Sequence, residues 1–235
     1  MRPDLRSRDT EAQELMDDAF CDEEVLRRTY ARFAVVNRLV SGWRRTYRGR
    51  IRPLLSAQRT TTLLDIGFGG GDLPRALRRW AAADGLRLEV DAIDPDARAF
   101  AFVSAQPATP GVRFRRTDSA ALVAAGERYD IVTSNHLLHH LDAATLPPLL
   151  ADSARLARRL VLHSDLRRSR TAYLGWAVAS WPAALDSFLH TDGLLSIRRS
   201  YAPAELAAVV PAEWRVQPQR PFRLLLSRES EPVDG

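Results

Sequence analysis

The distribution of apolar residues divides the chain into an N-terminal helical stretch and a longer region of alternating strands and helices. Apolar side chains recur at helical spacing from residue 24 to about residue 55, and a break near Ser41-Gly42 predicts two helices there. The first 20 or so residues are highly charged, so we expect them to be frayed, and we expect disorder in the tail at 229–235.

From residue 62 onward, short β-prone runs alternate with amphipathic helices, which predicts a doubly wound parallel sheet. After the fifth run the alternation stops, and the aromatic, apolar stretch 171–189 predicts helices inserted over the sheet. Two runs joined by a short Pro-containing turn close the chain, which suits a sheet whose last strand is antiparallel. The expected strands are 62–66, 87–93, 112–115, 129–133, 160–163, 214–217 and 222–227.

A glycine-rich turn follows the first expected strand, with glycines at Gly67, Gly69 and Gly71. Such a turn lets the backbone approach a ligand closely and points free helix N–H groups at it. A dinucleotide site would need Gly or Ala three residues after Gly69, where Asp72 stands instead. Asp65, two residues before the first glycine, adds a negative charge that would repel a pyrophosphate. Both acids favour S-adenosylmethionine, a ligand with a cationic amino group and a sulfonium, over NAD.

Further acids follow the next two strands. Asp94 precedes Pro95 at the end of the second strand, and Asp118 precedes Ser119 after the third. Either acid alone is explained equally well as a helix cap or turn residue. Their occurrence after consecutive strands favours a shared ligand site, because ligands of open α/β sheets bind at the carboxyl ends of the strands.

The pattern Asp-x-Gly-x-Gly-x-Gly resembles motif I of class I S-adenosylmethionine-dependent methyltransferases. The resemblance implies a Rossmann-like, doubly wound, seven-stranded α/β sheet with the last strand antiparallel. It also implies that Asp94 binds both ribose hydroxyls and that Asp118 accepts a hydrogen bond from the adenine amino group. The residues expected to bind the donor are Asp65, Gly67, Gly69, Gly71, Asp94, Pro95, Asp118, Ser119 and Asn135.

The segment 134–141 is similar to the Asn-x-x-x-His-His-Leu segment of small-molecule methyltransferases related to the ubiquinone and menaquinone biosynthesis enzymes. The stretch 30–44 resembles the lid of that group, which implies a helical lid at 1–58 and a methyltransferase domain at 59–235 with an insertion at about 166–200. Segments 164–169 and 192–201 resemble bacterial methyltransferases found beside type III polyketide synthases. This narrower resemblance implies O-methylation of a phenolic, quinone or polyketide-derived hydroxyl in secondary metabolism.

Two histidines are candidates for the chemistry of methyl transfer, which is an in-line displacement that aligns the acceptor and, for a phenol, removes its proton. His136 follows the fourth strand and His163 ends the fifth, so both are candidate bases or substrate ligands. The alternative for His163 is a hydrogen bond to the backbone, and His139 and His140 are explained by packing or capping. An acceptor that is already a phenolate needs no base.

The charge and the cysteine content restrict the ligands, partners and cellular location that we expect for the protein. The net charge is +5 and all 34 basic residues are arginine, yet they are interspersed with 29 acids, which argues against nucleic acid. Cys21 alone excludes an internal disulfide, and no Cys/His spacing indicates a zinc site, so we expect no metal. No signal core and no membrane span are evident, which favours the cytoplasm. We expect a small-molecule acceptor, and a homodimer through an apolar lid helix stays open.

Other functions stay open at this point. A methyltransferase of RNA or protein would need a basic surface or an Asn/Asp-Pro-Pro-Tyr/Phe-like element, whereas the chain has Ser134-Asn135-His136-Leu137 there. N- or C-methylation of a natural-product intermediate is a second alternative. A third is a relative that binds S-adenosylmethionine without methylating, since Phe68 could crowd the glycine loop.

Overall fold

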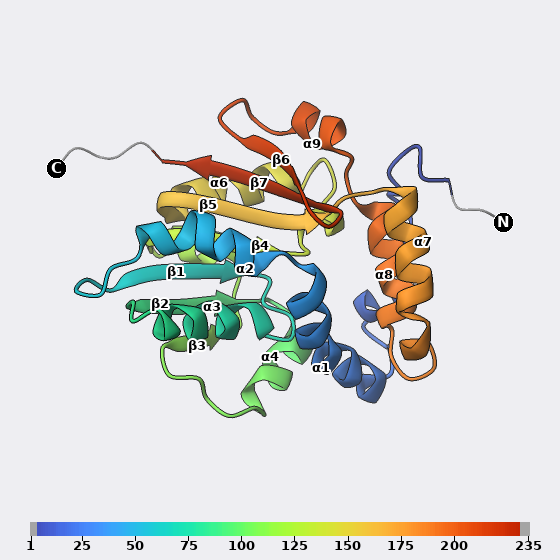
Figure 1. The fold of residues 1–235 in the computed structure, drawn as a ribbon, viewed down its shortest axis with the longest axis horizontal. Helices are drawn as coiled ribbons and strands as arrows, with labels where there is room; N and C mark the ends of the chain where they lie inside the picture. The colour runs from blue at the N-terminus through green and yellow to red at the C-terminus, as the bar shows by residue number, and fades with distance from the viewer. Residues whose placement is uncertain (1–3, 231–235) are drawn as a thin grey trace.

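Seven strands form one sheet in the order β3-β2-β1-β4-β5-β7-β6 (Figure 1). The structure is a computed structural model and describes residues 4–230, apart from the side chain of Leu39, so most of the expected C-terminal tail lies outside it. Strands β1 to β5 are parallel, and β7 runs antiparallel between β5 and β6, as the sequence predicts. The strands are β1 (Thr61–Ile66), β2 (Leu88–Ile93), β3 (Val112–Arg115), β4 (Tyr129–Asn135), β5 (Ala157–Leu166), β6 (Arg215–Gln219) and β7 (Arg223–Glu229).

Helices cover both faces of the sheet, because successive residues of a buried parallel strand point to opposite faces and both are apolar. On β1, Leu63 packs in one cluster with Trp43 and Leu77, and Leu64 packs in another with Leu149 and Leu206. The helices are α1 (Glu23–Val40), α2 (Trp43–Thr46), α3 (Asp72–Ala83), α4 (Ala97–Ser104), α5 (Ser119–Ala124), α6 (Leu146–Leu156), α7 (Arg170–Ala179), α8 (Leu189–Arg199) and α9 (Pro203–Val209). Short 3-10 or π turns are η1 (Leu15–Asp17), η2 (Tyr47–Ile51), η3 (Arg52–Leu54), η4 (Leu138–His140) and η5 (Trp181–Ala183).

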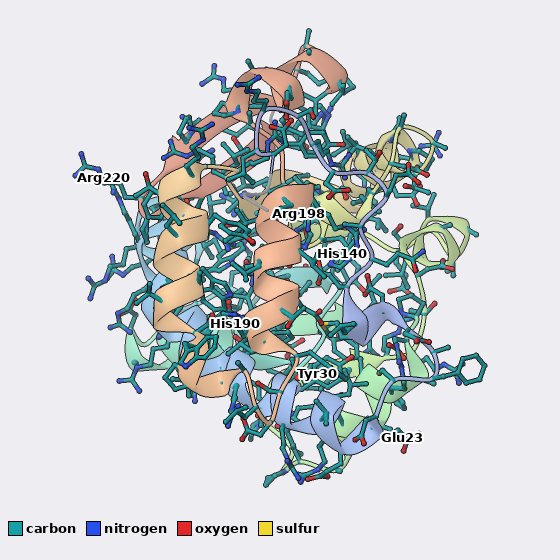
Figure 2. All side chains as sticks on the ribbon, turned by 90° about the vertical axis from the view of Figure 1, so that its right-hand side faces the viewer. Glu23, Tyr30, His140, His190, Arg198 and Arg220 are labelled. Atoms are coloured by element: carbon teal, nitrogen blue, oxygen red, sulfur yellow. The ribbon has the colours of Figure 1, made fainter. Side chains whose placement is uncertain are left out.

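Helix α1 and the helix pair α7 and α8 stand at the carboxyl ends of the strands, on the right of Figure 1. Asp22 caps α1 by accepting from the Val25 N–H, and Gly42 adopts a left-handed φ of 73° where α1 gives way to α2, the break that the sequence predicts. Helices α7 and α8 form the insertion after β5 and lie side by side in Figure 2. No helix within 4–230 is long and apolar enough to cross a membrane.

The N-terminal segment, residues 4–22, contacts the core, so the expectation that it frays is wrong for this part of the chain. The Arg8 guanidinium donates to the carbonyls of His139 and Leu141 at 2.8 and 2.6 Å. The Asp192 carboxylate on α8 accepts from the N–H groups of Leu15 and Met16 at 2.8 and 3.0 Å. In the sequence these charged residues resemble surface residues, because the residues that they contact lie far along the chain.

Candidate active site

The carboxyl ends of the parallel strands open into a cavity of about 340 Å³, walled also by α1, α8 and the N-terminal segment. One part of the wall carries carboxyl groups, which we call the acidic side: Asp65, Asp72 and Asp94. Another part carries imidazoles, which we call the histidine side: His136, His139 and His140. Apolar side chains supply much of the remaining wall, among them Phe33, Val36, Trp176, Leu189 and Ile197.

Two glycines of the loop differ in their surroundings, since one borders open space and the other is tightly packed. Gly69 has a φ of 49°, its N–H donates to the Asp94 carboxylate at 3.0 Å, and a Cβ placed on it would meet no other atom within 4 Å. Gly71 has a φ of 72°, and a Cβ there would lie 2.9 Å from both Phe114 and Val103. Gly69 therefore borders open cavity, whereas Gly71 lets α3 pack closely.

The three carboxyl groups of the acidic side take no part in the ion pairs formed within residues 4–230. Burial raises the pKa of Asp65 well above its ordinary value, and it also raises the pKa of Asp72 and of Asp94. Asp65 is 1 % exposed and accepts only from the Thr133 hydroxyl at 2.8 Å; Asp72 accepts from the Asn37 amide at 3.1 Å. None of the three forms an ion pair with a residue of the described chain. The acidic side is thus electrostatically suited to a cation.

The structure brings some of the expected donor-binding residues to the cavity and places others apart. Those on the cavity wall are Asp65, Gly67, Gly69, Asp94 and Asn135. Gly71, Pro95, Asp118 and Ser119 do not line it. Asp118 caps α5 by accepting from the Ala121 N–H at 2.9 Å, and the Ser119 hydroxyl donates to Asp152 at 2.8 Å. The adenine contact implied for Asp118 stays a prediction.

His136 is held in an unusual conformation at the end of β4. Its φ of 58° lies in the left-handed region, which is uncommon outside glycine and occurs often at functional sites. Its Nε2 lies 2.7 Å from an Arg223 guanidinium nitrogen, which can only donate, so Nε2 accepts and Nδ1 carries the proton. Burial, followed by the charge of Arg223, lowers its pKa well below the ordinary value. This geometry favours a ligand that donates through Nδ1 over a base.

Arg223 is a site residue that sequence analysis missed. It is 1 % exposed at the start of β7, and its guanidinium also donates to Asn135 Oδ1 at 2.5 Å and to the Ser164 hydroxyl at 3.0 Å. Burial lowers its pKa to about 10, against the raising effect of Asp165. One feature of the sequence could have identified it: Arg223 directly precedes the apolar run Leu224-Leu225-Leu226. An arginine next to such a run is expected to be buried and therefore to need buried partners.

His163 is not brought to the cavity with His136. Its ring is fully buried, stacks on Trp214 with a centroid distance of 5.6 Å, and its Nδ1 lies 2.7 Å from the Ser134 hydroxyl. Burial lowers its pKa to about 3, so it is neutral at ordinary pH. The ring lies in the core on the side of the sheet that carries α6 and α9. A direct chemical role for His163 stays untested, and the function proposed below does not use it.

His139 belongs to a buried charge network that the sequence pattern did not reveal. Its Nδ1 lies 2.7 Å from Asp165, and its Nε2 lies 3.3 Å from Glu14 of the N-terminal segment. Burial alone would lower its pKa, but Asp165 and Glu14 together raise it to about 9. The same contacts hold the pKa of Asp165 and of Glu14 below their ordinary values. His139 is therefore more than a packing or capping residue.

Phe68 packs beside the glycine loop without replacing its glycines. The ring is 4 % exposed and meets Phe114 edge to face at a centroid distance of 5.0 Å. It belongs to a small apolar cluster with Tyr30 and Val103. The large side chain of Phe68 beside the loop is therefore explained by its packing in this cluster.

Comparison with known proteins agrees with this fold and site. Residues 63–159, from β1 to β5, match the model of a family described as a methyltransferase domain. The match places a methyltransferase domain at residues 63–159, and the seven-stranded sheet with β7 antiparallel agrees with the class I fold, whose members use S-adenosylmethionine as methyl donor. No curated protein matches the sequence at a significant level.

Solved structures extend the likeness of fold over nearly the whole chain. The plantazolicin methyltransferase BpumL in complex with SAH is 12 % identical with a TM-score of 0.54, covering 87 % of this chain and 93 % of its own. Human N-acetylserotonin methyltransferase with SAM is 10 % identical with a TM-score of 0.60, covering 88 % and 56 %. The DhpI–SAH complex is 16 % identical with a TM-score of 0.51, covering 92 % and 97 %. At these identities the likeness concerns the fold.

Proposed function

We propose that the protein transfers a methyl group from S-adenosylmethionine to a hydroxyl oxygen of a phenolic, quinone or polyketide-derived small molecule. One observation carries the proposal: a cavity joins three carboxyl groups, none of them in an ion pair with another described residue, to an apolar wall with hydrogen-bonding side chains. The carboxyl groups suit a cationic donor, and the apolar wall suits a small aromatic acceptor.

The donor would lie along the acidic side and the glycine loop. The empty space beside Gly69 admits an atom of the donor, and the Asp94 carboxylate, at the end of β2, would accept from the ribose hydroxyls. Asp65 and Asp72 would supply negative potential for the ammonium and sulfonium groups. The methyl group would then point toward the end of β4, where Asn135 and His136 line the cavity.

The acceptor would bind among the histidine side and the helices of the lid. The Nδ1–H of His136 would donate to the acceptor oxygen, since Arg223 holds its Nε2. The acceptor would react as a phenolate that has lost its proton to solvent: the new O–CH₃ bond forms as the S–CH₃ bond breaks, and the sulfonium becomes a neutral thioether. Alignment of the two reactants would supply much of the rate enhancement.

Further observations support a small-molecule acceptor. Two of the structural neighbours are named for plantazolicin and N-acetylserotonin. The alternating arginines and acids give no long basic run for nucleic acid. We further propose a cytoplasmic enzyme, on the single cysteine of the chain, with a homodimer as an open possibility.

The experiment has two stages. Calorimetric titration with S-adenosylmethionine and with SAH measures donor binding first. Methyl-labelled donor is then incubated with a panel of phenols, hydroquinones, amines and activated carbon nucleophiles, and product mass and fragmentation locate the methyl group. We expect label on phenolic oxygen. Tight donor binding with label on nitrogen or carbon would contradict the oxygen assignment, and binding without any transfer would contradict the enzymatic proposal.

A further inference from the structure

We propose that Glu14, His139 and His140 form a binding site for a divalent transition-metal ion, such as Zn²⁺, in the wall of the cavity. The three side chains come from the N-terminal segment and η4, and all three line the cavity. Figure 2, in which the right-hand side of Figure 1 faces the viewer, shows His140 near the N-terminal segment and α8. Two imidazoles and one carboxylate are a ligand set that first-row divalent metals accept.

The spacing of the ligand atoms is close to what one ion requires. One ligand atom from each of the three residues can be chosen so that all lie within 4.8 Å of one another. His139 Nε2 lies 3.3 Å from Glu14 Oε1, and His140 Nε2 lies 3.9 Å from Glu14 Oε2. Metal bonds of about 2.0–2.2 Å place neighbouring tetrahedral ligands about 3.3 Å apart. The His139–Glu14 distance of 3.3 Å meets this spacing, and the His140–Glu14 distance of 3.9 Å exceeds it by about 0.6 Å.

Each imidazole has a carboxylate behind it. Asp165 lies 2.7 Å from Nδ1 of His139, and Asp17 lies 3.2 Å from Nδ1 of His140. Such a carboxylate keeps the proton on Nδ1, orients the ring and increases the basicity of Nε2, which is the usual environment of a metal-binding histidine. Both Nε2 atoms therefore face the Glu14 carboxylate.

His139 Nε2 is a buried polar atom whose interactions are incomplete. The side chain is 1 % exposed, and Nε2 has no hydrogen-bond partner of correct geometry in the described part of the chain. Its Nε2 lies 3.3 Å from Glu14 Oε1 without the geometry of a hydrogen bond. Buried polar groups are normally paired, which makes this atom an independent sign of a missing ligand.

The charge around the site also suits a cation. Glu14, Asp165 and Asp192 are buried carboxyl residues of this region, each 3 % exposed. Asp192 lies on α8 and accepts from two backbone N–H groups next to Glu14. A divalent ion bound there would have these carboxyl groups around it and would displace any proton on the Nε2 atoms that bind it.

Three protein ligands leave at least one coordination position, and the ligands border the cavity, so that position would face the acceptor. An ion there would bind and polarise a phenolate or carboxylate oxygen of the acceptor. This role rests on the proposed methyl transfer. Metal binding itself does not, and its test needs neither donor nor acceptor.

The opposing explanation is a metal-free ion-pair network that ties the N-terminal segment to the core. This network involves the same side chains, so a loss of stability on substitution does not distinguish it from the proposal. A measurement of metal binding does. Metal-free full-length protein, prepared by dialysis against a chelator, is titrated with Co²⁺ and followed by its visible absorption. Zn²⁺ affinity is then measured by competition with a chromogenic chelator, and elemental analysis gives the stoichiometry.

We expect a single ion per chain with an absorption spectrum typical of low coordination number. His140 is only partly exposed, and the His140→Gln variant should fold and lose metal affinity. For Asp17→Asn, which changes the carboxylate behind His140, we expect a loss of about 10–100-fold, and the loss in His140→Gln should be larger. Glu14→Gln should behave as His140→Gln does. The matched control is His190→Gln, which removes a histidine bonded to Ser180 in the insertion after β5 and should leave metal affinity unchanged.

Absence of saturable metal binding would overturn the proposal, as would full affinity in His140→Gln or an equal loss in His190→Gln. Donor titration of the same metal-free sample separates this result from the proposed function. Donor binding without metal binding refutes only the metal site, and metal binding without donor binding refutes only methyl transfer.

Discussion

On the acidic side of the cavity, Asp65, Asp72 and Asp94 lie near one another without a cation, whereas on the histidine side the buried charge of His139 has two carboxylates beside it. Burial is the main cause that raises the pKa of the acids, whereas the carboxylates beside His139 raise its pKa against the lowering effect of burial. The contrast is between carboxyl groups that form no ion pair within the described residues and a histidine that already has two carboxylates beside it. Substitutions on the two sides should therefore differ in whether they change affinity or stability.

The largest expected effect is on stability, at the histidine side. Arg223→Met leaves buried acceptors on Asn135, His136 and Ser164 without their donor, so we expect the free energy of unfolding to fall by about 3–5 kcal/mol. Urea unfolding followed by circular dichroism measures it. The exposed neighbour Arg220 is the control, and Arg220→Ala should change stability by less than about 0.5 kcal/mol. Equal effects of the two variants would show that the buried network contributes nothing.

Next in size is an effect on donor affinity, at the acidic side. Asp94→Ala removes the carboxylate expected to bind the ribose, and loss of hydrogen bonds to a charged group should cost about 2–3 kcal/mol, or roughly 30–150-fold in Kd. Titration calorimetry with SAH measures it. Asp84→Ala, which changes an acid at the end of α3 away from the cavity, should leave Kd unchanged. An unchanged Kd in Asp94→Ala would remove Asp94 from the donor site.

A smaller effect concerns pH. Burial keeps Asp65 neutral below its raised pKa, and a cationic donor favours the ionised form, so binding lowers that pKa and releases a proton. Donor affinity should therefore rise with pH, by at most about tenfold per unit for one proton, and level off above the pKa of the free protein. Titrations in buffers of different ionisation enthalpy count the protons. Asp65→Asn should reduce the slope, and an identical slope would assign the protons to other groups.

The smallest expected effect compares two glycines of similar backbone geometry. Gly69 and Gly85 have φ values of 49° and 70°, and a Cβ on either would meet nothing within 4 Å. Alanine at each position should cost about 1 kcal/mol of stability through backbone strain. Only Gly69→Ala should also weaken donor binding, because its methyl group enters the cavity. Equal donor affinity in both variants would place the donor elsewhere.

The sheet and the glycine loop were predictable because their signals are local. Consecutive apolar residues such as Leu63 and Leu64 indicate a strand covered on both faces, and glycines that alternate with other residues indicate a ligand loop. Contacts between distant segments left no such signal. Glu14 lies in a charged stretch that resembles surface, and nothing in its neighbourhood points to His139.

The two candidate histidines show the same limit. Both follow strand ends, but residues of a strand alternate between faces, and an error of one position changes the side on which a ring lies. His163 shares its face with Val161 in the core cluster of α6, whereas His136 leaves β4 with a left-handed φ that turns it toward the cavity. The choice between these outcomes depends on Ser134, Trp214 and Arg223, whose positions only the folded chain defines.

The place of Arg223 in the chain has a consequence for the order of synthesis. The ribosome produces the acidic side well before Arg223, since Asp65 to Asp94 all precede it in the sequence. Until then, Asn135 and His136 lack their partner, and β7 has not paired with β5. A nascent or truncated chain would form its donor loop without a finished reaction chamber. Competence for chemistry would thus arrive only after β7 has been made and has paired with β5.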